Sequence, residues 1–137
     1  MNGTDEVEVF AGEDHRMVRI SPPRKLNSNE QQLLGKLADA AGWSQTEFRC
    51  QAKHAAVIEE CAAGCGTVGL AVDADACPPA ALHGTNPASA QGRLRSGEQV
   101  RIVILVEQGY LRQMECYLAT GGVPRGLPNA DALEYYG

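Results

Sequence analysis

Apolar and polar residues alternate directly after a Cys- and Gly-containing turn, and this pattern predicts a β-hairpin. Val68, Leu70 and Val72 are separated by smaller residues, and the turn sequence AAGCG precedes them. Alternation at every second position indicates a strand with one buried face, and the turn composition interrupts regular structure. We therefore predict a first hairpin with strands at about 55–61 and 67–73.

A second hairpin is predicted from the most β-branched segment of the chain. Residues 100–106 read VRIVILV, the composition of a strand buried on both faces. Gln108 and Gly109 then favour a tight turn. Apolar and polar residues alternate again over 110–118, which we predict to be the return strand.

Two helices are predicted before the first hairpin. Apolar residues recur at helical spacing over 28–41, where Ser28 is the predicted N-cap and Gln31 completes a capping box. A second helix, at about 45–54, follows the capping-box sequence SQTE. The elements together predict an α+β domain, in which two N-terminal helices cover an antiparallel sheet of about four strands.

The remaining segments are predicted to be irregular. Residues 1–15 are acidic and read as a flexible leader, and 16–137 are expected to form a single domain. The sequence Pro22–Pro23 is expected to stop any regular element. Residues 74–98 are rich in Ala, Pro, Gly and Ser and predict a long loop, while the tail is expected to dock on a sheet edge.

Composition narrows the classes of function. The 137-residue chain has a formal net charge of −5, which argues against sequence-independent binding of nucleic acid. No apolar run approaches the ~20 residues of a membrane span, and the acidic N-terminus does not resemble a secretory signal. We therefore expect a cytoplasmic protein without membrane contact. Five cysteines are an odd number, and in a reducing compartment we expect them to be free thiols.

Cysteine and histidine spacing suggests a zinc site, but predicted geometry argues against its simplest form. Cys50 and His54 lie four residues apart on one helical face, and Cys61 and Cys65 follow. An extended segment over 55–60 would place Cys61 ~20 Å from the helix end at ~3.3 Å per residue. Ligands of one zinc ion lie within ~4 Å of each other. These four residues are therefore not expected to bind one ion.

A rearranged zinc site is the alternative that the predicted loop allows. It would combine Cys61 and Cys65 of the turn with Cys77 and His83 of the loop. Cys61 and Cys65 could instead form a disulfide across the turn, if their Cα atoms come within ~7 Å. The simplest expectation is that these cysteines are inert buried thiols and that no cofactor is bound.

A DNA-binding alternative comes from the two predicted helices. Residues 37–48 fit the frame of a helix-turn-helix, with a small residue, a glycine and a bulky apolar residue at the expected spacing. The second helix would present Gln45, Thr46, Arg49 and Lys53 to a major groove. Two core helices that restart at a glycine produce the same pattern. The acidic charge balance also disfavours a nucleic-acid partner.

Several short motifs resemble a family of small uncharacterised bacterial proteins, mostly from high-GC Gram-positive species. The similarity covers roughly residues 26–136. It is carried by Gln51, His54, Ala55 and Val57, by CAAGCGTV at 61–68, by LAVD at 70–73, and by Val106, Gly109, Leu111, Glu115 and Tyr117.

The chain departs from that family's C-x-C-G-C turn at two positions. Ala63 replaces the middle cysteine and Gly66 replaces a proline. If the three cysteines hold a metal ion in the family, this chain lacks one ligand. The family has no assigned activity, so the resemblance implies a shared architecture only.

No catalytic constellation accompanies these motifs. His15, His54 and His83 occur in three different contexts, without a nucleophile elbow or a metal-hydrolase motif. We therefore expect a small non-catalytic binding protein, with an unidentified protein as its partner. A helix-turn-helix regulator is the first alternative, and a zinc- or thiol-dependent protein that uses Cys61 and Cys65 is the second.

Overall fold

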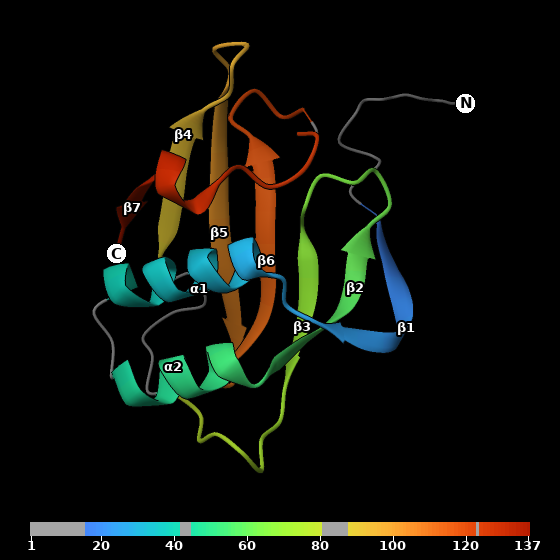
Figure 1. The fold of residues 1–137 in the computed structure, drawn as a ribbon, viewed down its shortest axis with the longest axis vertical. Coiled ribbons are helices and arrows are strands. Elements are labelled where there is room, and N and C mark those ends of the chain that lie inside the picture. Colours follow the sequence, from blue (N-terminus) through green and yellow to red (C-terminus); the bar gives the residue numbers. More distant parts are fainter. Residues whose placement is uncertain (1–15, 42–44, 81–87, 123) are drawn as a thin grey trace.

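The structure, a computed structural model, describes residues 16–41, 45–80, 88–122 and 124–137. In this part of the chain, two α-helices lie on one face of a seven-stranded antiparallel sheet (Figure 1), so the predicted α+β class is confirmed. The elements in chain order are β1 (Met17–Lys25), α1 (Ser28–Ala41), α2 (Gln45–Lys53), β2 (Ala55–Cys61), β3 (Val68–Val72), β4 (Ser89–Arg93), β5 (Gln99–Glu107), β6 (Tyr110–Leu118), the 3-10 helix η2 (Ala130–Ala132) and β7 (Glu134–Tyr136).

The sheet contains both predicted hairpins and three further strands. Its strand order is β1-β2-β3-β6-β5-β4-β7, and the pairs β2–β3 and β5–β6 are the hairpins predicted from sequence. The predicted number of about four strands is wrong, because β1, β4 and β7 also join the sheet within the described residues. The helices are also not both N-terminal to the sheet, since β1 precedes α1.

β1 runs through Pro22–Pro23, where we predicted no regular element. The strand is at one edge of the sheet and pairs with β2 alone, and its register shifts between Arg19 and Arg24. Proline lacks a backbone N–H, so it is tolerated at an edge or an irregularity, where no ladder hydrogen bond is required. The prediction failed because the two prolines lie at such a position.

β4 lies within the segment 74–98 that we predicted to be a loop. Its sequence SAQGR contains none of the β-branched residues that favour strands. The strand nevertheless pairs with β5 on one side and with β7 on the other. Gly92 has a steric reason, because a Cβ atom there would lie 2.7 Å from Leu133 Cδ2 and 3.1 Å from the backbone oxygen of Ala132. The expectation that the tail docks on a sheet edge is confirmed by β7.

The hydrophobic core lies between the helices and the sheet. α1 has the predicted bounds, and Leu33, Leu34, Leu37 and Ala38 of its apolar stripe are buried. The core consists mainly of helix residues packed against the inward-facing residues of β2, β3, β5 and β6: Leu33, Leu34, Leu37, Phe48, Val57, Leu70, Val100, Ile102, Ile104, Leu111, Met114 and Cys116.

α1 begins with a capping box that is one residue earlier than predicted. Asn27 Oδ1 accepts a hydrogen bond from the backbone N–H of Glu30 at 2.8 Å, and Glu30 Oε1 accepts one from the backbone N–H of Asn27 at 2.8 Å. The box predicted at Ser28 and Gln31 is therefore wrong, although the spacing of three residues is right. The cap predicted for α2 at Ser44 lies outside the described residues.

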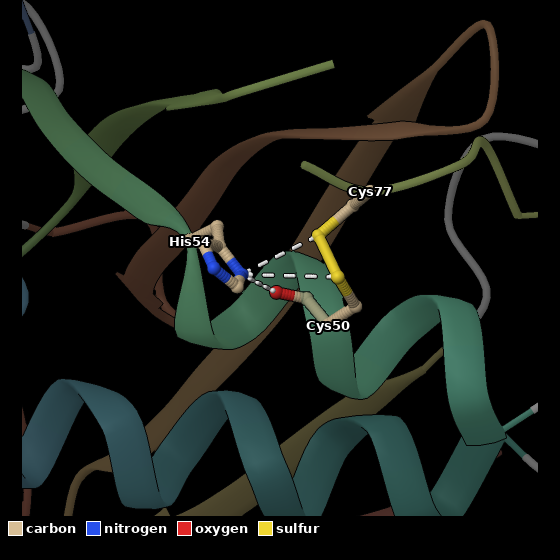
Figure 2. Close-up of side chains that lie close together, drawn as sticks. All are labelled: Cys50, His54 and Cys77. Carbon is tan, nitrogen blue, oxygen red and sulfur yellow. Dashed lines mark hydrogen bonds between the residues drawn. A yellow bond between two sulfur atoms is a disulfide. The ribbon is translucent and has the colours of Figure 1, made fainter. Parts of the chain in front are cut away.

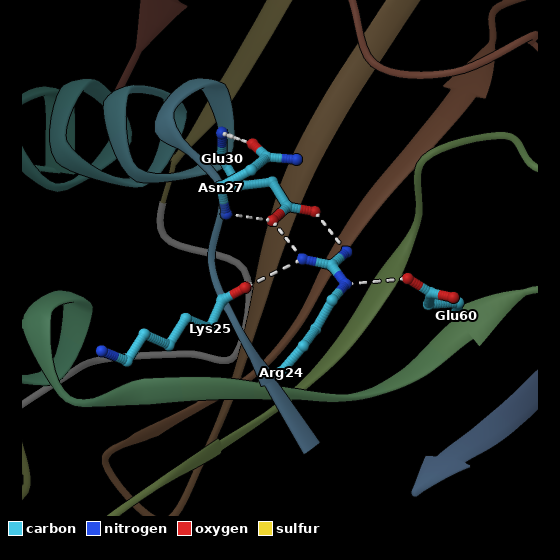
Figure 3. A network of polar contacts seen from close by, with 5 residues as sticks. All are labelled: Arg24, Lys25, Asn27, Glu30 and Glu60. Atoms are coloured by element: carbon cyan, nitrogen blue, oxygen red, sulfur yellow. Dashed lines mark hydrogen bonds and ion pairs between the residues drawn. The ribbon is translucent and has the colours of Figure 1, made fainter. Parts of the chain in front are cut away.

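Glu30 also connects the helix to the sheet through Arg24 (Figure 3). Its side chain is buried, and both of its oxygens accept hydrogen bonds from the Arg24 guanidinium at 2.9 Å. Arg24 Nε donates to Glu60 Oε2 of β2, also at 2.9 Å. The hydrogen bonds that Arg24 donates to Glu30 are the main cause that raises the pKa of Arg24 further above its usual value. The bidentate pair compensates the charge of the buried Glu30 carboxylate and links β1 to α1. The hydrogen bond to Glu60 links β1 to β2.

We expect Arg24→Met to lower the free energy of unfolding by about 2–3 kcal/mol, because the buried Glu30 carboxylate would lose its charged partner. Urea denaturation measures this change. Arg49→Met is the matched control, since the Arg49–Asp39 pair is exposed and its loss should change stability by less than about 0.5 kcal/mol. Equal losses in the two variants would contradict the structural role of Arg24.

Candidate functional site

A disulfide joins α2 to the segment that follows β3 (Figure 2). It links Cys50 and Cys77, whose Cα atoms are 5.7 Å apart. The side chain of Cys77 is buried, and that of Cys50 is half-buried. These two cysteines were expected to be free thiols, and that expectation is wrong for this pair. The sequence offered no means of choosing this pairing, because the two residues are 27 positions apart.

The imidazole of His54 lies against this disulfide. Its Nδ1 atom is 3.5 Å from Cys77 Sγ and 3.7 Å from Cys50 Sγ, and it is 3.0 Å from the carbonyl oxygen of Cys50 (Figure 2). Among the described residues, these three side chains form a cluster whose ligand atoms all lie within 4.8 Å of one another. The predicted proximity of Cys50 and His54 on one helical face is therefore confirmed, and Cys77 is their third neighbour.

The segment that carries Cys77 is held in place by the buried side chain of Gln51. Gln51 Nε2 donates to the carbonyl oxygens of Pro78 at 3.1 Å and Gly109 at 2.8 Å, and Oε1 accepts from the backbone N–H of Leu111 at 3.0 Å. Gln51 is 0% exposed, and its amide has partners on both its oxygen and its nitrogen. One side chain of α2 thus joins the Cys77 segment to the β5–β6 turn.

Further contacts with the β5–β6 turn fix the same segment. The Tyr110 hydroxyl donates to the carbonyl oxygen of Cys77 at 3.1 Å, and the backbone N–H of Ala80 donates to Gly109 O at 2.9 Å. Gly109 has a φ of 85°, and a Cβ atom there would lie 2.7 Å from Pro79 Cβ. Glycine is required both by this conformation and by the close approach of the segment. None of these contacts involves the disulfide sulfurs.

The predicted zinc ligands Cys61, Cys65, Cys77 and His83 are not brought together in the described residues. Cys77 is bonded to Cys50 on α2, whereas Cys61 is the last residue of β2. The seven-residue strand β2 is extended, as predicted, and spans ~20 Å at ~3.3 Å per residue. His83 lies outside the described residues. The structure therefore separates Cys61 and Cys65 from the sulfur of Cys77.

Cys61 and Cys65 lie instead in the core, together with Cys116. All three are free of disulfides and buried, so the disulfide considered between Cys61 and Cys65 is not formed. Cys65 Sγ donates to Thr67 Oγ1 at 3.2 Å, and that hydroxyl also bonds the backbone N–H of Cys116 at 2.9 Å.

Burial disfavours the thiolate forms of Cys65 and Cys116. It raises the pKa of Cys116 to about 12 and is the main cause that raises the pKa of Cys65. A nucleophile or metal ligand must be a thiolate, so these thiols have the character of small core hydrophobes.

The residues proposed to contact DNA lie on α2. Arg49 forms an exposed ion pair with Asp39 of α1 at 3.2 Å, and Lys53 is also exposed. Gln45 and Thr46 belong to α2, but their side chains are outside the description. The two helices run in opposite directions over the same face of the sheet (Figure 1), whereas helix-turn-helix motifs cross at roughly 90–120°. DNA binding remains a prediction.

The other face of the sheet has a separate polar and aromatic surface, which we call the open face. Because Ile102 and Ile104 point to the core, their neighbours in β5 point away from the helices. Strand register places the following residues in two adjacent rows across this face: Tyr117, Arg101, Gln91 and Glu134, then Glu115, Val103, Ser89 and Tyr136.

A hollow of about 240 Å³ lies on the open face. Its lining includes Arg101, Val103, Tyr117 and Tyr136. Arg101 is exposed and forms no ion pair with another residue in the described part of the chain. This surface was not predicted, because the composition of residues 100–106 is that of a strand buried on both faces. The single charged residue of that run, Arg101, was the signal of an outward position.

Comparisons with family models, with curated proteins and with solved structures find no match to this chain. The resemblance described from its motifs therefore remains a prediction. Among the described helices, none combines the length and the apolar character that crossing a membrane requires.

We expect peptide mapping without reduction to recover one linked pair of peptides, containing Cys50 and Cys77, because these residues are disulfide-bonded in the fold. Cys61, Cys65 and Cys116 should react with iodoacetamide only after denaturation, because they are buried. Mass spectrometry distinguishes the two groups. A linked Cys61–Cys65 peptide, or rapid native alkylation of these thiols, would contradict this arrangement.

The raised pKa of Cys116 predicts a specific loss of stability in alkaline solution. Between about pH 9 and 12 the folded state retains a proton on Cys116 that the unfolded chain has lost, so the free energy of unfolding falls as pH rises, by up to about 1.4 kcal/mol per pH unit. Cys116→Ala removes this contribution. Urea denaturation at pH ~8 and ~10.5 measures the effect. Between these two pH values, the free energy of unfolding of the wild type should fall by about 2 kcal/mol more than that of the variant. Parallel pH profiles would argue against the raised pKa.

Proposed function

We propose that this chain is a small non-catalytic binding protein whose partner is another protein, and that the open face of the sheet makes the contact. The observation that carries this proposal is Arg101, an exposed cation that lies beside two tyrosines and forms no ion pair among the described residues. The described helices and the segment that leads to β7 all lie on the opposite face of the sheet (Figure 1), so none of them covers this surface.

The composition of the open face supports a protein as the partner. Tyrosine and arginine are enriched in protein interfaces and dominate their binding energy, because their side chains combine a large contact area with hydrogen-bonding groups. Tyr117 pairs directly with Arg101 across β5 and β6, and the exposed Tyr136 lies in the adjacent row. Sheet residues on rigid, paired strands also lose little conformational freedom when a partner binds.

The hollow defines the chemistry that a partner should present. Val103, Tyr117 and Tyr136 line the hollow and give it aliphatic and aromatic surface, which suits a single apolar side chain. Arg101 lies at the same hollow and would attract a carboxylate that accompanies this side chain. We therefore propose a partner segment that carries an apolar residue close to an acidic one.

Site-specific photocrosslinking tests this proposal. A benzophenone amino acid at position 117 should form a defined protein adduct in extract from the native host, whereas the same group at position 32, on the exposed side of α1, should not. Excess unlabelled wild-type protein should compete for the adduct. The competitor Arg101→Glu should be at least about tenfold weaker, because it places a like charge against the partner's carboxylate.

Arg49→Glu is the matched control, since it reverses an exposed arginine on the helix side of the molecule. It should compete as well as the wild type. Equal competition by Arg101→Glu and Arg49→Glu, or identical adducts from positions 117 and 32, would refute the assignment of the contact to the open face.

A further inference from the structure

We propose that Cys50, His54 and Cys77 form a redox-gated metal site. In the disulfide form the site is closed, and in the dithiol form it binds one thiophilic ion such as Zn²⁺ through two thiolates and one imidazole. This site is distinct from the open face, and it differs from the zinc set predicted from sequence in using the α2 pair with Cys77.

The position of the imidazole carries the geometric argument. Two ligands at ~2.3 Å for sulfur and ~2.0–2.1 Å for nitrogen, around a tetrahedral zinc ion, are about 3.5 Å apart. His54 Nδ1 lies 3.5 Å from Cys77 Sγ and 3.7 Å from Cys50 Sγ (Figure 2). The nitrogen is thus already at ligand distance from both sulfurs, and reduction would have to separate only the sulfurs from each other.

The surrounding hydrogen bonds keep the three residues together without the disulfide. Cys50 lies in the last turn of α2 and His54 is the residue that follows the helix. The backbone N–H of His54 donates to the carbonyl oxygen of Cys50 at 3.1 Å, which fixes their spacing at one turn. Cys77 is held by the Tyr110 hydroxyl on its carbonyl oxygen and by Gln51 on the next residue. The dithiol form therefore retains the arrangement, as a preformed site requires.

Gating follows from the balanced chemistry of the two steps. A thiolate of an external dithiol attacks the sulfur of the half-buried Cys50, forms a mixed disulfide and releases the thiolate of Cys77. The second thiol of the reductant then attacks the mixed disulfide and releases Cys50. The reductant becomes a disulfide, and the protein gains two electrons and two protons. Zn²⁺ binding then releases both thiol protons and forms two Zn–S bonds. In the disulfide form His54 Nδ1 lies 3.0 Å from the carbonyl oxygen of Cys50, a contact in which the nitrogen is the donor. Metal binding replaces this hydrogen bond: the Nδ1 proton leaves to solvent, Nε2 takes up a proton, and the lone pair of Nδ1 binds the ion.

The site leaves one coordination position for water or for an outside ligand. Three protein ligands with an open fourth position are typical of zinc sites that exchange or activate a ligand, whereas structural zinc sites are closed by four protein ligands. His54 is exposed, so the open position is next to solvent.

Zinc titration of the full chain in its two redox states tests the proposal. Protein reduced with dithiothreitol, freed of reductant under argon and titrated against a chromogenic chelator should bind one Zn²⁺ per chain. The oxidised protein should bind at least about 100-fold more weakly. Co²⁺ in place of Zn²⁺ should give sulfur-to-cobalt charge-transfer absorption in the reduced protein only.

Variants locate the ion. Cys77→Ser should abolish binding to the reduced protein, and His54→Ala, which leaves the disulfide intact, should weaken it at least tenfold. Cys116→Ala is the matched control and should leave the affinity unchanged, because that thiol lies in the core. Equal binding by the oxidised protein, no binding by the reduced protein, or unchanged affinity in His54→Ala would each overturn the site. Loss of the near-ultraviolet circular dichroism of the native fold on reduction would overturn it as well, because the segment would then depend on the disulfide.

Discussion

The hydrogen bonds of one buried amide set the relative positions of three parts of this fold. Gln51 points from α2 into the core and bonds the carbonyl oxygens of Pro78 and Gly109 and the backbone N–H of Leu111. Buried backbone groups without partners cost about 1–3 kcal/mol each, so this side chain determines where the irregular segment after β3 can lie. The position of Cys77 beside Cys50, and hence the disulfide itself, follows from that constraint.

The two proposed sites lie on different parts of the molecule and depend on different properties. The Cys50–His54–Cys77 cluster is at the end of α2, where side chains from a helix and from an irregular segment meet. The open face is formed by paired strands, and Arg101 and Tyr117 are positioned there by register alone. The core contains the buried thiols Cys65 and Cys116, whose burial favours the neutral form. Binding and redox chemistry can therefore vary independently in this architecture.

Local sequence patterns predicted the helices and strands that have a clear signal in their own residues. They missed the elements that form only because strands distant in the sequence pair with them. The leucine stripe of α1, the alternation in β3 and the β-branched run of β5 gave the correct elements. β4 was missed because Ala90 and Gly92 have low strand propensity and are held by pairing on both sides. The Cys50–His54 spacing indicated part of the site, but Cys77 could not be assigned, since its position results from contacts between residues distant in sequence.

The junction of β3 with β6 has a mechanical consequence for the whole sheet. The two strands pair over only two residues on each side, Val68 and Gly69 with Met114 and Gln113, whereas β5 and β6 pair over eight. Side-chain hydrogen bonds extend this short junction on both sides: Thr67 Oγ1 accepts from the backbone N–H of Cys116 at one end, and Arg112 donates to the carbonyl oxygen of Leu70 at the other. The sheet thus has two parts, β1 to β3 and β4 to β7, that share only this narrow junction, so bending between the two parts would disturb few backbone hydrogen bonds.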